Sequence, residues 1–147
     1  MITEKGIENS SAKKFPPDTI LIAMYGQGKT RGKVAILGIK AATNQACAAI
    51  LPSKRAVPFF VFQNIAGRYE ELRSLSNDGG QKNLSQSLIR DLPICLPPKI
   101  DEQKMIADCL SPLDGLITGQ TEQIAALKEH KKSLMQQLFP NPELSRQ

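Results

Sequence analysis

The stretch "ILIAMYGQGKTRGKVAILG" (residues 20–38) decides how the first part of the chain folds. Its Gly-Lys-Thr step at residues 28–30 matches the end of a phosphate-binding loop, which follows a strand. Such a loop must continue into a helix, because the helix N-terminus supplies N–H donors to the phosphates. Here Gly32 and the apolar run 34–37 follow instead, and these residues favour a strand. The pattern therefore predicts two strands joined by a basic glycine turn, with nucleotide binding kept as an alternative.

The basic turn carries Lys29, Arg31 and Lys33, separated by small residues. Residues 1–58 hold nine Lys and Arg against three Asp and Glu, so the positive excess of the chain belongs to this part. Cations gathered at a hairpin tip suit an acidic partner, and DNA phosphate is the commonest one. The turn is the first candidate DNA contact, although a solvated loop could have the same composition.

Length and composition exclude several classes of protein. The 147 residues suit one domain with a modest core, since 41% of them are hydrophobic. No apolar run reaches membrane-spanning length and the N-terminus lacks the apolar segment of a signal peptide, so we expect a cytoplasmic protein. Cys47, Cys95 and Cys109 lie far apart in apolar surroundings, and His130 is the one histidine. We therefore expect buried free thiols, no metal site and no cofactor.

The remainder of residues 1–98 mixes strands with a helix. Residues 46–52 are expected to form a third strand, and residues 89–98 a short strand ended by two prolines. Between them, Pro58 opens a helix expected over residues 58–75. Its buried face is predicted from the apolar side chains that recur at helical spacing: Phe59, Phe62, Ala66, Tyr69 and Leu72.

A polar loop over residues 76–85 supplies the second candidate DNA contact. Gln81, Lys82 and Asn83 follow two glycines that allow unusual backbone angles. An exposed amide side chain can bind adenine through two hydrogen bonds, so this loop could read bases. The polar run Thr43–Gln45 precedes an apolar strand, and we expect these side chains to bond backbone groups within the fold.

Beyond Pro97 and Pro98 the sequence changes to a heptad pattern. Steps of four and three from Ile106 to Leu138 meet an apolar residue at eight of ten positions, which is typical of a helix that pairs with another helix. Pro112 is expected to kink this helix or to start a new one. The residues predicted to form the pairing surface are Ile117, Ile124, Leu127, Leu134 and Leu138.

Three strings in this order carry a family resemblance: ATNQAC at Ala42–Cys47, GGQKNLS at Gly79–Ser85 and LPPKIDEQ at Leu96–Gln103. With the strands before them and the final helix, they resemble the specificity (S) subunit of type I restriction-modification systems over residues 7–139. The resemblance implies a DNA-reading subunit without catalytic activity. In that family a target recognition domain reads half of a bipartite DNA site, and spacer helices dock the methyltransferase (M) subunits, which act with restriction (R) subunits.

A complete family member has two recognition domains and two antiparallel spacer helices, whereas this sequence resembles the later part of one domain and one helix. We therefore expect an α+β fold, with a partial, β-rich recognition domain at 1–98 and a coiled-coil-forming helix at 99–147. The single helix is expected to pair with a second copy as an antiparallel homodimer. Two other functions remain open: an oligomerisation or decoy fragment that binds no specific DNA, and a phosphate-loop nucleotide-binding protein.

Overall fold

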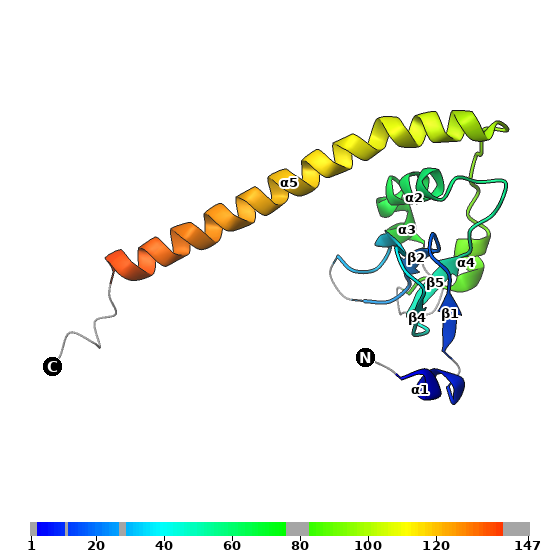
Figure 1. Cartoon of the computed structure of the whole chain (residues 1–147), viewed down its shortest axis with the longest axis horizontal. Helices are drawn as coiled ribbons and strands as arrows, with labels where there is room; N and C mark the ends of the chain where they lie inside the picture. Colours follow the sequence, from blue (N-terminus) through cyan, green and yellow to red (C-terminus); the bar gives the residue numbers. More distant parts are fainter. Residues whose placement is uncertain (1–2, 11, 27–28, 76–82, 140–147) are drawn as a thin grey trace. The chain divides into compact units, whose positions relative to one another are not determined.

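The computed structural model describes residues 3–10, 12–26, 29–75 and 83–139. The chain divides into two compact units, Met1–Ala107 and Asp108–Gln147. The first unit holds all the strands and four short helices of the described residues, and the second continues the long C-terminal helix α5 (Figure 1). The mixed α+β fold predicted from the sequence is confirmed.

A three-stranded antiparallel sheet forms the centre of the first unit. β2 (Ile20–Ala23) lies between β3 (Val34–Ile36) and β5 (Cys47–Ile50). Ile20 is opposite Ile36 on one side and Ile50 on the other, so apolar side chains cross the sheet on one face. The strand–turn–strand prediction for residues 20–38 is confirmed, and Thr30 is followed by a strand rather than a helix.

A second, two-stranded sheet pairs β1 (Lys13–Phe15) with β4 (Ala41–Thr43) in antiparallel register. The sequence analysis did not predict this ribbon, because three residues are too few to show a period of two. It also missed α1 (Glu4–Glu8), whose N-cap Thr3 accepts a hydrogen bond from the amide of Gly6 at 3.2 Å.

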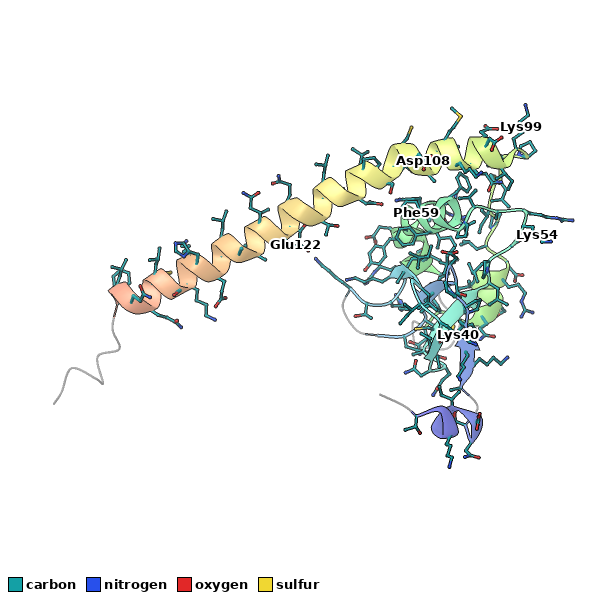
Figure 2. All side chains as sticks on the ribbon, viewed as in Figure 1. Lys40, Lys54, Phe59, Lys99, Asp108 and Glu122 are labelled. Carbon is teal, nitrogen blue, oxygen red and sulfur yellow. The ribbon has the colours of Figure 1, made fainter. Side chains whose placement is uncertain are left out.

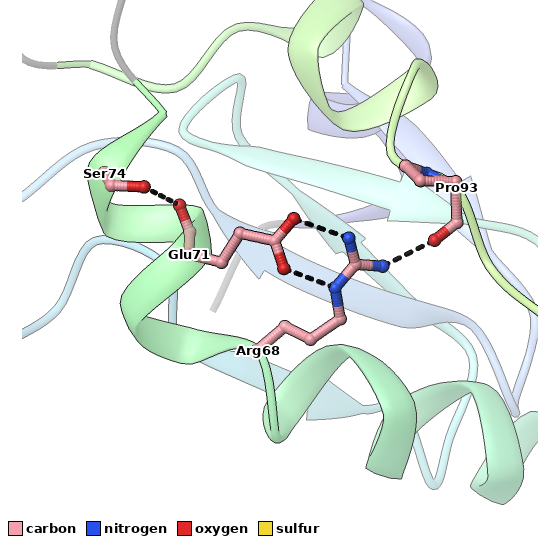
Figure 3. Close-up of polar contacts among 4 residues, drawn as sticks. All are labelled: Arg68, Glu71, Ser74 and Pro93. Atoms are coloured by element: carbon pink, nitrogen blue, oxygen red, sulfur yellow. Dashed lines mark hydrogen bonds and ion pairs between the residues drawn. The ribbon is translucent and has the colours of Figure 1, made fainter.

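The single helix predicted over residues 58–75 is two helices, α2 (Pro58–Ala66) and α3 (Tyr69–Ser74). Gly67 ends the first, and Arg68 leaves helical geometry at φ −100° and ψ 25°. The Arg68 guanidinium then bonds both carboxylate oxygens of Glu71 at 2.6 Å and the carbonyl of Pro93 (Figure 3). These bonds fasten the break between the helices to residues 92–98, a long-range contact that helical spacing cannot predict.

The core packs α2, α3 and α4 (Gln86–Arg90) against the sheet. Leu72 is fully buried as predicted, whereas Phe59 and Phe62 are only half-buried, with ring centroids 5.5 Å apart. The break at Gly67 changes the helical phase, so a stripe drawn through both helices misses the residues that are most buried. The buried apolar residues are Ile20, Ile22, Met24, Ala48, Phe60, Val61, Ile65, Leu72, Leu84, Ile89 and Ala107.

The strand predicted over residues 89–98 is wrong. Ser85 caps α4 instead, with its hydroxyl accepting a hydrogen bond from the amide of Leu88 at 3.3 Å. The chain then runs without a strand to α5, because Pro93, Pro97 and Pro98 cannot donate to a ladder. Its apolar side chains still contribute to the fold, since Leu92 and Ile94 pack against the core.

The long helix α5 (Ile100–Leu138) begins directly after the two prolines, as their position predicts. It continues through Pro112, so of the two outcomes predicted there, a kink or a new helix, the new helix is wrong. Gln103 and Ala107, one turn apart, are its buried residues, and both belong to the first unit. No helix among the described residues is long and apolar enough to cross a membrane.

Candidate nucleic-acid interface

The basic turn between β2 and β3 is held on α3 by three side chains. The hydroxyl of Tyr69 donates to the carbonyl of Lys29 at 2.8 Å, and Nη1 of Arg73 donates to that hydroxyl at 2.9 Å. Nη2 of Arg31 donates to the carbonyl of Arg73 at 2.9 Å. The backbone of the described part of the turn is therefore fixed by contacts some 40 residues away in sequence.

Gly32 lets the turn approach α3 closely. Its φ of +82° is one that residues with a Cβ rarely adopt, and a Cβ there would lie 3.3 Å from Cγ of Arg73 and 3.4 Å from Cβ of Leu72. Glycine at this position thus satisfies both the backbone conformation and the packing of the turn.

The three cations of the turn have different surroundings. Lys29 and Lys33 are exposed, and neither forms an ion pair in the described part of the chain. Arg31 is half-buried, and part of its guanidinium is used in the bond to Arg73. Its Nε is buried without a hydrogen-bond partner in the structure. The turn therefore presents two free ammonium groups, with Arg31 bound beside them.

The second predicted contact is described only at Asn83, because Gln81 and Lys82 lie outside the described residues. Asn83 is half-buried, and the next residue, Leu84, donates its amide to the carbonyl of Met24 at 3.1 Å. This bond brings Asn83 to the end of β2, where the basic turn begins. Of the polar run 43–45, Asn44 behaves as predicted, because its Oδ1 accepts from the amide of Ala46 at 3.1 Å.

Sequence reasoning missed two further cations, Lys13 and Lys14, which are exposed on β1. The charge count of residues 1–58 included them, but only the pairing of β1 with β4 places them on an ordered ribbon. A short strand with two lysines carries no motif that would have singled them out.

The predicted pairing surface lies along α5 and is exposed (Figure 2). The exposed fractions of its five residues run from 41% at Leu134 to 70% at Leu138. Isolated apolar residues on a surface are ordinary, but a stripe of them at heptad spacing is typical of a helix that packs against a partner.

The described residues bring together no group of potential metal ligands. No three His, Cys, Asp or Glu side chains lie close enough there to hold a metal ion. The three cysteines are free, as predicted, but the prediction that they are buried is wrong, because Cys95 and Cys109 are exposed and Cys47 is half-buried. The polar groups that the structure does gather are cations and hydrogen-bonding side chains, which suit binding to an anionic partner.

Comparison with known proteins supports this interpretation. The family model of the type I restriction modification DNA specificity domain matches residues 1–129. Three specificity subunits of type I restriction enzymes from Methanocaldococcus jannaschii are similar to the chain. The MjaVIII subunit is 32% identical over 80 residues, which are 54% of this chain and 19% of that protein. The MjaIX subunit is 29% identical over 140 residues, which are 94% of this chain and 32% of that protein.

The putative MjaX subunit is 42% identical over 59 residues, which are 40% of this chain and 14% of that protein. The chain therefore spans a third or less of the length of these relatives. The family model covers both the sheet-containing unit and the first part of α5, so the chain belongs to the family of type I restriction modification DNA specificity domains.

Proposed function

We propose that this chain is a DNA sequence-recognition component of a type I restriction-modification system and has no catalytic activity of its own. The observation that carries the proposal is the family match over residues 1–129, which includes the sheet-containing unit and most of α5 in one continuous block. We place the boundary between the recognition domain and its helix between residues 98 and 99, at the end of the proline pair. The partners would be DNA and the methyltransferase and restriction subunits of the same system.

In this proposal the basic turn makes the electrostatic contact with DNA. Lys29 and Lys33 are exposed and fixed on a turn that α3 holds in place, so they could bind phosphates with little loss of backbone entropy. Arg31 contributes its remaining donors and fastens the turn. Gln81, Lys82 and Asn83 are assigned to base reading, because amide side chains distinguish adenine in the major groove.

Titration of the intact chain with duplex DNA at several salt concentrations tests the proposal. Each phosphate contact contributes about 0.9 to the slope of log affinity against log salt. The variant Lys29→Ala with Lys33→Ala should therefore flatten the slope by about 1.8, equally for all DNA sequences. A chain without salt-dependent DNA binding would contradict the proposed function.

Two further variants separate roles within the interface. Arg31→Ala should lower the slope again if the guanidinium contacts a phosphate, whereas a purely structural role would lower only the stability of the fold. Gln81→Ala and Asn83→Ala should change the preference among sequences by about 1–3 kcal/mol for each lost two-bond contact, with little effect on the slope. If they unfold the protein instead, the loop is structural.

A second function, oligomerisation without specific DNA binding, is favoured by one observation, the exposed apolar stripe of α5. Both functions require the apolar stripe of α5 to pack against a helix, and a second copy of this chain carries the same stripe. We therefore propose an antiparallel homodimer through α5. Sequence-selective DNA binding by the chain would decide for recognition over a purely oligomerising role.

A further inference from the structure

We propose that a groove formed by β1, β4 and the outer edge of β5 receives the sugar–phosphate backbone of one DNA strand. This inference rests on the proposed function and adds to it a contact surface that shares no residue with the basic turn. The ligand is assigned by chemistry, as a polyanionic strand with regularly spaced phosphates.

The groove consists of two adjoining hollows in the first unit. One has a volume of about 420 Å³ and the other of about 550 Å³. The two hollows adjoin, because they share four lining residues: Lys13, Phe15, Cys47 and Gln86. The second follows β5, which pairs only with β2 among the described strands, and it extends to Arg90.

The register of the β1–β4 ribbon explains which side chains face the groove. Lys13 is directly opposite Thr43, and Phe15 is opposite Ala41. Because side chains alternate along a strand, Lys13, Phe15 and Thr43 share one face, and all three line the first hollow. Gln45 joins them from the turn after β4, and Gln86 from the start of α4.

The polar side chains of the groove lining suit a phosphate, and in the second hollow they lie beside an apolar wall, since eight of its twelve lining residues are Ala, Ile, Leu or Phe. It offers two cations, Lys13 and Arg90, together with amide and hydroxyl groups. Neither hollow is lined by a carboxylate. In the described part of the chain, Lys13, Gln45, Gln86 and Arg90 form no hydrogen bond or ion pair through their side chains. Lysine, arginine, threonine and glutamine are the side chains that commonly bond DNA phosphates.

The shape of the groove favours the DNA backbone over the bases. Base edges lie about 8.5 Å deep in the major groove, so protruding side chains are needed to reach them. A concave surface instead fits the convex ridge of a sugar–phosphate strand. The groove would therefore fix the position of the domain on DNA and leave sequence reading to other residues.

The test compares the salt dependence of duplex DNA binding for the intact chain and for Lys13→Ala with Arg90→Ala. Loss of two phosphate contacts should flatten the slope by about 1.8. The matched control is Lys40→Ala with Lys54→Ala, because both lysines are exposed and labelled in Figure 2, and neither lines a hollow. An unchanged slope in the Lys13 and Arg90 variant would overturn the proposed DNA contact at the groove and leave the proposed function intact. An equal change of slope in the control would attribute the effect to net charge, and it would also overturn the groove contact.

A second pair of variants avoids removing any side-chain packing. Gln86→Glu places a carboxylate in the groove and should weaken DNA binding at least about tenfold at low salt, whereas Gln123→Glu on exposed α5 should not. Equal effects of the two would overturn the groove. Displacement of DNA by inorganic phosphate beyond that of chloride at equal ionic strength would indicate a small-anion site instead. A chain that binds no DNA at all would overturn both this inference and the proposed function.

Discussion

Replacement of Gln103 by leucine should destabilise the first unit strongly. The Gln103 side chain is fully buried, and its amide makes three hydrogen bonds to the backbone. Oε1 accepts from the amide of Val57 at 2.8 Å, while Nε2 donates to the carbonyls of Pro97 at 2.8 Å and Arg55 at 3.2 Å. Both N–H donors and the oxygen of the carboxamide are thus used, and the bonds to Arg55 and Val57 join α5 to the segment before α2.

The expected loss of unfolding free energy follows from the backbone groups that lose their hydrogen bonds to Gln103. Arg55 is exposed, so its carbonyl can find water, whereas Val57 and Pro97 are half-buried. A buried polar group without a partner costs about 1–3 kcal/mol, so for these two part-buried groups we expect a loss toward the lower end of about 2–6 kcal/mol, from a total that is typically about 5–15. Leucine keeps nearly the same volume, which separates this effect from a cavity.

Urea unfolding monitored by tyrosine fluorescence measures this loss. Both tyrosines lie in the first unit and the chain has no tryptophan, so helix content in the second unit does not contribute to the signal. With a slope of about 2 kcal/mol per molar urea, the midpoint should fall by about 1–3 M. Gln123→Leu at an exposed position of α5 is the control. A midpoint within about 0.3 M of the unaltered protein would refute the reasoning.

Three other perturbations have defined outcomes. Leu127→Asp with Leu134→Asp should convert the proposed dimer to a monomer in sedimentation, because each buried leucine contributes about 1.5–3 kcal/mol, whereas Gln123→Asp should leave the mass unchanged. Hydrogen bonds from the Arg68 guanidinium lower the pKa of Glu71. The ionised Glu71 therefore stabilises the fold above the usual glutamate pKa, and this contribution is lost as the pH falls through the lowered pKa. Glu71→Gln should remove that part of the acid sensitivity in pH-dependent unfolding. Gly32→Ala should cost at least about 1 kcal/mol in urea unfolding, because alanine is strained at positive φ, and an unchanged midpoint would contradict the packing of the turn.

The features predicted correctly are those encoded by neighbouring residues. Two apolar runs separated by a glycine turn predict the β2–β3 hairpin, and the prolines at 97 and 98 predict where α5 begins. The wrong predictions concern elements decided by distant contacts. Arg68 bonds Pro93 across 25 residues at the break between α2 and α3, and the apolar run around Ile94 packs on the core without forming a strand. Periodicity cannot distinguish a strand from an apolar segment held by side chains.

The candidate interface shows the same division between local and distant information. The sequence displays Lys29, Arg31 and Lys33 as three equal cations, but the structure binds Arg31 to Arg73, 42 residues later, and leaves the two lysines exposed. Gln103 shows the opposite difference. A glutamine at the start of a helix is expected at the surface. In the structure it is completely buried, and its three hydrogen-bond partners lie on two other segments. In both cases the role of a polar side chain depends on which backbone groups the fold brings within hydrogen-bond distance. Composition can therefore suggest an acidic partner for this domain, whereas the division of its polar residues into those that hold the fold and those proposed to face DNA requires the tertiary structure.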